Sequence, residues 1–263
     1  MISAFAGGLA ELVKRPLFFV PALIGMCLNA AILMLALGSY EAIFFGTIIS
    51  GDVPDAPLIS QPYYFAANNL TDTIIIGLAL LGTIIVGTLM LFTYAKMLTA
   101  KKTGIAGGIS FALSKLPQAI WLGIFTFVAL FLYSVVAFLL FAASISFETW
   151  GTVAFAGFLL WLAFGAFAYL KFAFTPLFIA VEGLDLKKAL AKSWKSSSGK
   201  AIPIAIFLFL AYLATGLVGG AAFALSDLAS DELISLAIVV LGISLSNAYY
   251  NIVFTKYFTG AVN

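Results

Sequence analysis

Polar side chains that could hold an anion recur at matched positions, each close to the end of a long apolar stretch. They form three pairs, namely Tyr94 with Lys96, Tyr169 with Lys171, and Tyr249 with Asn251. Around a common axis, their ammonium, amide and phenol groups would form a polar ring. Such a ring could hold a lipid phosphate or another anion through charge-assisted hydrogen bonds.

Lys171 has two interpretations. If the apolar stretch before it ends at residue 170, the ammonium reaches the headgroups from the inner membrane boundary. If the helix instead continues toward Ile179, the charge lies inside the membrane, where charges are costly and usually functional. Glu182 nearby could pair with Lys171 or bind a cation, or it could be a carboxylate favoured by the start of the next helix.

A second group of residues could anchor the chain at the membrane surface. Between about 184 and 197, apolar residues recur at helical spacing with Trp194 among them, and lysines occupy the other side. This pattern is typical of an amphipathic helix lying in the interface. Asp185 is expected to cap its start and Gly199 to end it. The anchoring residues would be Lys187, Lys188, Lys192, Trp194 and Lys195.

The sequence lacks the residues that several kinds of catalytic and metal-binding site require. The chain has no histidine and a single cysteine, so imidazole bases, histidine metal ligands and internal disulfides are excluded. No acid falls within the long apolar stretches, which argues against both catalysis and ion coupling. We therefore expect no enzymatic activity, no metal and no cofactor.

The composition indicates a membrane environment. Of 263 residues, 63% are hydrophobic and 9% are charged, against about 25% charged in soluble domains. Six charge-free stretches are long enough to cross a bilayer, which takes about 20 residues. We predict an all-α, polytopic membrane protein forming one integral domain over 1–263, with spans at about 17–39, 73–95, 118–142, 150–171, 202–225 and 234–255.

The charges also predict an orientation. With six spans, all 13 basic residues fall on the side of the two termini, and the opposite side carries acids alone. Basic residues favour the cytoplasmic side. We expect a multi-pass protein of the cell membrane with both termini in the cytoplasm. The connection 41–72 on the other side is expected to be irregular, and Asn69-Leu70-Thr71 within it fits the N-glycosylation pattern.

The chain reads as three parallel repeats of a surface helix followed by a helical hairpin. Shorter versions of the 184–197 pattern precede the first and third spans, at 2–15 and 109–117, and 104–108 is expected to be a flexible connection. The fourth and sixth spans end alike at an offset of 80 residues, where Phe174, Thr175 and Phe178 match Phe254, Thr255 and Phe258.

The run FTPLFIAVEG at 174–183, followed by KALAKSW at 188–194, resembles the signature of a family of six-span membrane domains. That family includes the membrane domain of some glycerophosphoryl diester phosphodiesterases and uncharacterised bacterial and archaeal multi-pass proteins. Lys14-Arg15-Pro16 is similar to the family's opening. The chain has no room for the phosphodiesterase domain itself, so the resemblance implies a membrane domain without that activity.

The expected function is a non-enzymatic, membrane-embedded scaffold or lipid-interacting module. The alternative is a permease or channel for a small or anionic solute, with the polar ring as its constriction. Membrane lipids, anionic ones included, are the expected partners. A protein partner or a second copy of the chain also fits, and nucleic acid is not expected.

Overall fold

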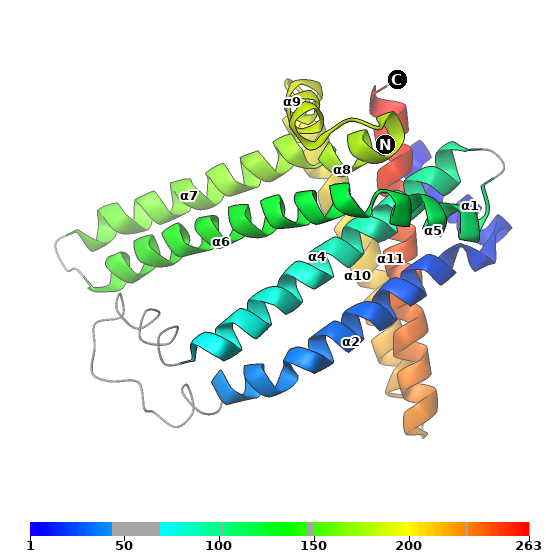
Figure 1. The fold of residues 1–263 in the computed structure, drawn as a ribbon, viewed down its shortest axis with the longest axis horizontal. Helices are drawn as coiled ribbons and strands as arrows, with labels where there is room; N and C mark the ends of the chain where they lie inside the picture. The colour runs from blue at the N-terminus through cyan, green and yellow to red at the C-terminus, as the bar shows by residue number, and fades with distance from the viewer. Residues whose placement is uncertain (44–68, 101–102, 147–149, 230, 263) are drawn as a thin grey trace. The chain divides into compact units, whose positions relative to one another are not determined.

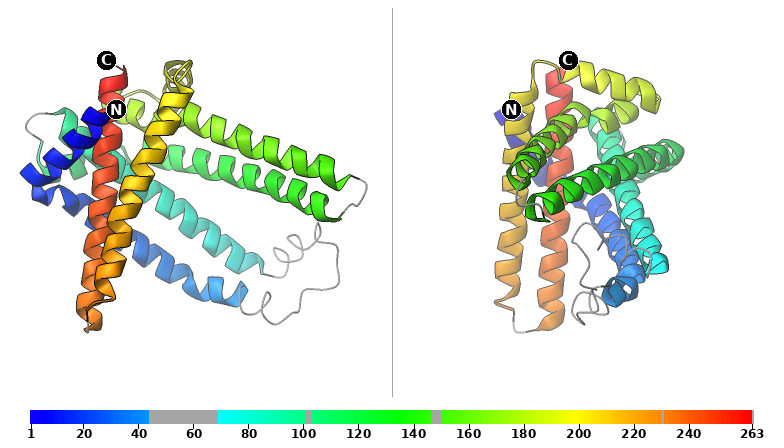
Figure 2. Two further views of the ribbon diagram at one scale, coloured as in Figure 1. Left: turned by 180° about the vertical axis from the view of Figure 1, so that it is seen from behind. Right: turned by 90° about the vertical axis from the view of Figure 1, so that its left-hand side faces the viewer.

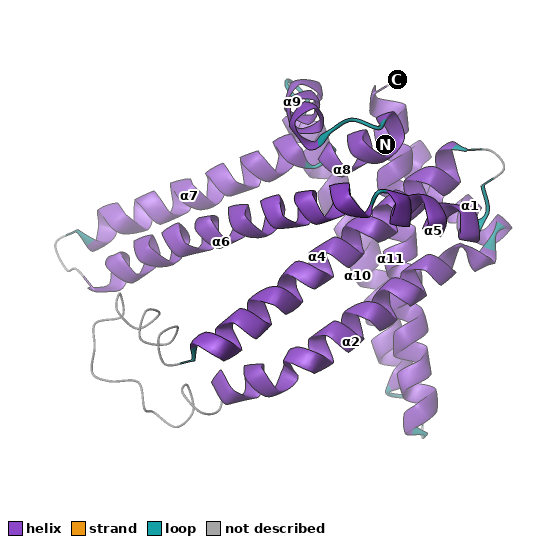
Figure 3. Ribbon diagram, in the orientation of Figure 1, coloured by secondary structure: helices purple, strands orange, loops and turns teal. Residues whose placement is uncertain are grey.

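A computed structural model describes residues 1–43, 69–100, 103–146, 150–229 and 231–262. Throughout these residues the fold is helical, and no strand occurs among them (Figures 1 and 3). The elements run in the order α1 (Ile2–Lys14), η1 (Pro16–Phe19), α2 (Val20–Ile43), α4 (Leu70–Thr99), α5 (Ile105–Ser114), α6 (Leu116–Ser146), α7 (Gly151–Phe172), α8 (Thr175–Glu182), α9 (Leu186–Ser196), α10 (Ala201–Ser226) and α11 (Glu232–Val262).

Six helical segments in the described chain are long and apolar enough to cross a membrane, which confirms the predicted fold class. Their bounds are Pro16–Glu41, Leu70–Thr99, Leu116–Ser146, Gly151–Glu182, Ala201–Ser226 and Glu232–Gly260. Most extend beyond the predicted spans, because a helix can continue past its apolar core into polar surroundings. α4, for example, has 30 residues and is about 45 Å long at 1.5 Å per residue.

The described residues form two compact units. The first comprises Met1–Leu28, Val86–Leu122 and Leu170–Asn263, and the second comprises Asn29–Ile85 and Gly123–Tyr169. In the first unit α10 and α11 run side by side as a long hairpin (Figure 2). The side chains discussed below belong mainly to the first unit.

Aromatic packing between α8 and α11 fills part of the first unit's core. The rings of Phe174 and Phe254 lie 5.8 Å apart, and those of Phe178 and Phe258 meet edge to face at 4.9 Å. All four side chains are buried. Edge-to-face and offset pairs add stabilisation beyond the area that they bury, so the matched residues of the two helix ends hold each other in place.

Close approach and ring stacking hold the second unit together. The rings of Tyr133 on α6 and Trp161 on α7 stack at 5.5 Å, and Nε1 of Trp161 donates to the carbonyl of Tyr133 at 3.0 Å. A Cβ at Gly123 would lie 2.7 Å from Cγ1 of Ile85, so this glycine lets α6 approach α4.

The short segment expected to be a flexible connection is helical instead. α5 begins at Ile105 and includes Gly107 and Gly108. A Cβ at Gly108 would lie 2.7 Å from Cγ of Met97, so the missing side chain allows α5 to pack on α4. The prediction of a flexible connection at 104–108 was therefore wrong, because this tertiary contact stabilises a helix in spite of the low helix propensity of glycine.

A short helix precedes a pair of long helices in each third of the chain, with α1, α5 and α9 in this position. The order of elements does not establish equivalence in space, so the threefold repeat stays a prediction. The irregular connection expected at 41–72 falls mostly outside the described residues.

Candidate functional site

The site is built on a break between α7 and α8. Pro176 lies in the first turn of α8 and has no N–H to continue the hydrogen bonding of α7. α7 ends at Phe172, one residue after Lys171. The carbonyl of Lys171 accepts a hydrogen bond from the hydroxyl of Ser193 at 2.8 Å. The hydroxyl of Ser197 also lies 3.2 Å from this carbonyl, but it shares its proton with the nearer carbonyl of Ser193 at 2.7 Å. The Ser193 bond is thus the main link from α9 to the end of α7, and Ser197 adds a weaker contact.

The side chain of Lys171 is buried in this corner, with a residue exposure of 6%. Its Nζ donates to the hydroxyl of Ser198 at 3.1 Å and lies 5.2 Å from the ring centre of Trp194. The Ser198 hydroxyl donates its own proton to the carbonyl of Trp194 at 2.9 Å. Its oxygen is therefore the acceptor for the Lys171 ammonium.

α9 itself has a buried side and a basic side. Ala189 and Ser193 are buried, Leu186 and Leu190 are half-buried, and the four lysines are exposed. Trp194 is 43% exposed and packs against Phe172 with ring centres 5.5 Å apart. The helix begins within two residues of the position predicted from sequence.

The predicted cap of α9 is confirmed. Oδ1 of Asp185 accepts a hydrogen bond from the backbone N–H of Lys188 at 2.8 Å. This bond, helped by the Lys188 ammonium 3.1 Å from Oδ2, lowers the pKa of Asp185 below its ordinary value of 3.8. Gly199 adopts a positive φ of 74° in the turn after α9, a conformation that favours glycine.

The four lysines of α9 differ in their pairing. Lys188 pairs with Asp185, and Lys192 pairs with Glu182 and lies over the ring of Phe178. Glu182 therefore has Lys192 as its ion-pair partner. Lys187 and Lys195 are exposed and form no ion pair among the described residues, although the charge of Lys187 also helps to lower the pKa of Asp185. Their charges are available to a ligand.

The other members of the predicted polar ring have contacts of their own. Tyr94 is buried and donates to the carbonyl of Phe18 at 2.6 Å. Nζ of Lys96 lies 5.1 Å from the ring centre of Phe111, and Tyr249 donates to the carbonyl of Phe5 at 3.4 Å. Asn251 is buried and donates within its own helix to the carbonyl of Asn247 at 2.8 Å.

Tyr169, the remaining member, is 50% exposed and falls in the second unit. The contacts of Tyr94, Lys96 and Tyr249 link α4 and α11 to neighbouring elements, and the contact of Asn251 stays within α11. All four contacts indicate a packing role. The ring as an anion site stays a prediction.

Sequence reasoning missed the serines that surround Lys171. Ser193 was assigned only to the apolar stripe of the surface helix, and Ser197 and Ser198 were given no role. Ser193 and Ser197 are four residues apart and therefore share a helix face, which is the signal that could have grouped them. Their partner could not be inferred, because the acceptor is a backbone carbonyl on a different helix.

No family model, curated protein or solved structure matches this chain. The resemblance to the six-span family therefore stays a prediction, and function is argued from the geometry alone.

Proposed function

We propose that the protein is a non-enzymatic membrane module whose α9 surface binds anionic lipid headgroups on the cytoplasmic side. α9 follows the candidate span Gly151–Glu182 and precedes the candidate span Ala201–Ser226. This order supports a position of α9 where the chain would leave and re-enter the membrane. The excess of basic residues on that side supports the cytoplasmic orientation.

The observation that carries the proposal is the pair of exposed lysines that form no ion pair among the described residues, Lys187 and Lys195. Lysine is a strongly hydrated point charge that binds phosphate groups. α9 is held to α7 by Ser193 and Ser197, so the two charges are presented on an anchored helix. Trp194 supports the same placement, because tryptophan is enriched at the membrane interface.

Native mass spectrometry of the purified protein with mixed lipids tests the proposal. We expect the Lys187→Ala/Lys195→Ala variant to retain less phosphatidylglycerol, relative to phosphatidylcholine, than the wild-type chain. A lysine near an anionic surface contributes about 1 kcal/mol, which corresponds to roughly a fivefold loss of retention for each lysine removed.

The Lys188→Ala/Lys192→Ala variant is the matched control, because it removes two charges from the same helix. These lysines already pair with Asp185 and Glu182, so a smaller loss is expected. Equal retention of both lipids by the wild-type chain would contradict the proposal.

A permease or channel for a small or anionic solute is the second candidate, and the buried ammonium of Lys171 is the observation that favours it. Proteoliposomes distinguish the two functions. Uptake of an anionic solute that is lost in Lys171→Ala would favour transport. Lipid retention without uptake would favour the lipid-binding module.

A further inference from the structure

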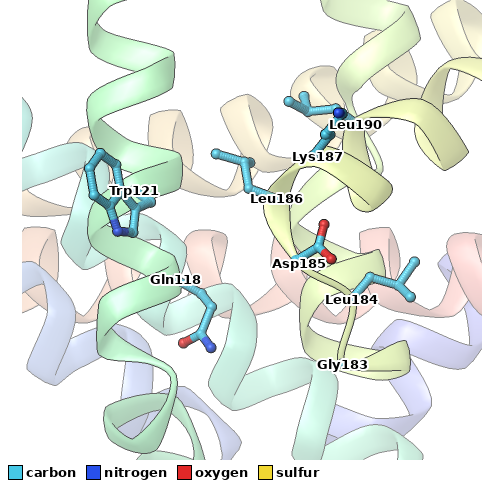
Figure 4. Close-up of a pocket in the computed structure, with 8 residues that line it drawn as sticks. All are labelled: Gln118, Trp121, Gly183, Leu184, Asp185, Leu186, Lys187 and Leu190. Carbon is cyan, nitrogen blue, oxygen red and sulfur yellow. The ribbon is translucent and has the colours of Figure 1, made fainter.

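A hollow of about 820 Å³ lies between the first turns of α6 and the segment that joins α8 to α9. Gln118 and Trp121 line it from α6, and residues from Gly183 to Leu190 line it from the other side (Figure 4). All of these residues belong to the first unit. The hollow lies at the ends of two candidate spans, where a bilayer places its headgroups.

An amide oxygen in the wall of this hollow has no partner. Oε1 of Gln118 is buried and accepts no hydrogen bond within the described structure. In Figure 4 the amide extends from α6 on the side of the loop at Gly183, with its nitrogen nearer to that loop than its oxygen. Buried polar atoms are nearly always bonded to protein or water, so this oxygen requires a donor from outside the described chain.

The charged residues of the hollow are not equivalent. Both carboxylate oxygens of Asp185 are engaged, one by the N–H and the other by the ammonium of Lys188. Lys187, also in the wall, is exposed and forms no ion pair in the described ranges, although its charge helps to lower the pKa of Asp185. The hollow therefore offers one exposed positive charge, and its wall contains one buried acceptor without a partner.

Apolar side chains make up much of the remaining wall. Leu186 and Leu190 line it from α9, and Trp121, which is 64% exposed, lines it from α6. The side chain of Leu186 points toward α6 in Figure 4. A ligand that fits must combine an anion, a hydrogen-bond donor and an apolar part.

We propose that the hollow is a binding site for a phospholipid whose anionic headgroup carries hydroxyl groups, of which phosphatidylglycerol is the representative. Its phosphate would bind Lys187, and the start of an acyl chain would pack beside Trp121. A glycerol hydroxyl would donate to Oε1 of Gln118 once the side-chain amide turns this oxygen toward the hollow. Phosphatidylcholine lacks both the net negative charge and the headgroup donor. This inference rests on the proposed lipid-binding function and names the lipid class.

Competition between two lipids of equal charge tests the inference by native mass spectrometry. Phosphatidylmethanol has the phosphodiester charge of phosphatidylglycerol but no headgroup hydroxyl. We expect the wild-type chain to retain phosphatidylglycerol about two- to tenfold better, the range for one neutral hydrogen bond. Gln118→Leu should abolish this preference and keep both anionic lipids above phosphatidylcholine.

Asn29→Leu is the matched control, because Oδ1 of Asn29 is also buried without a partner but does not line the hollow. This variant should keep the preference for phosphatidylglycerol. Equal retention of the two anionic lipids by the wild-type chain would overturn the inference and leave the proposed function intact. Equal retention of all three lipids would overturn the proposed function itself. The wild-type comparison decides even if Gln118→Leu fails to fold.

Discussion

Single hydroxyl and carboxylate groups decide where α9 lies and where it begins. Ser193 and Ser197 bond to one carbonyl at the end of α7, and Asp185 closes the first turn of α9. A carbonyl in the last turn of a helix has no backbone N–H partner within that helix, and a side-chain hydroxyl can donate to it instead. Lys187 and Lys195, which form no ion pair among the described residues, are therefore displayed by a helix that other residues hold in place.

The carboxylate of Asp185 predicts a specific response of α9 to acid. Its pKa is lowered in the folded protein, so the folded state binds this proton more weakly than the unfolded chain does. The stabilisation is complete above the ordinary pKa of 3.8 and is lost as the pH falls through the lowered value. Amide hydrogen exchange of α9, corrected for intrinsic rates, should show loss of protection in that range.

Asp185→Asn keeps a capping side chain but removes the titrating charge. We expect this variant to show less protection of α9 at neutral pH and a weaker dependence on acid below pH 3.8. An identical acid response in the two proteins would show that other carboxylates control the stability of α9.

At the level of whole elements, glycines determine how closely two helices can pack. In the hairpin of α10 and α11, the glycine at the close contact is not part of the small-xxx-small pattern that usually marks such contacts. A Cβ on Gly242 of α11 would overlap the Cβ of Ala222 on α10. Gly216 and Gly220, which form a small-xxx-small pair on α10, face no atom of the described chain within 4 Å of an added Cβ. The close contact of this hairpin is therefore at Gly242 and not at the glycine motif.

Alanine substitutions separate these two kinds of glycine. Gly242→Ala should destabilise the protein by about 1–3 kcal/mol through overpacking. Gly220→Ala should be neutral or stabilise it by up to about 1 kcal/mol, because alanine has the higher helix propensity. Denaturant unfolding in detergent micelles measures both effects. Equal changes in the free energy of unfolding would contradict the helix contact described above.

For the whole molecule, the distribution of charge determines the expected orientation in the membrane. If each of the six candidate spans crosses the membrane once, α9 and the two termini lie on the same side. That side carries all 13 basic residues. This orientation would present α9 to the cytoplasmic leaflet, which is the more anionic one.

Cysteine labelling in whole cells tests the orientation. In a Cys27→Ser background, Asp227→Cys should react with a membrane-impermeant maleimide on intact cells. Lys195→Cys should react only after the cells are permeabilised. Both residues are exposed in the structure, so burial does not limit the reaction. The reverse pattern would place the termini outside.

The spans were predictable because they depend on one local property, the absence of charge over 20 or more residues. The cap at Asp185 was predictable for the same reason, since its partner is three residues away. The bonds from Ser193 and Ser197 to the carbonyl of Lys171 were not, because they depend on where Pro176 breaks the helix. The unpartnered oxygen of Gln118 likewise requires knowledge of every neighbour in three dimensions.

Two glycines with positive φ angles flank α9, Gly183 at 69° and Gly199 at 74°. For other L-residues the left-handed conformation costs about 1–2 kcal/mol, so these two joints set the path of the backbone into and out of the helix. The exposed side of α9 is then free to change its charges while its direction is kept. Substitutions on the exposed side of α9 are therefore expected to change its surface charge and to leave the two glycine turns, and with them the direction of the helix, unchanged.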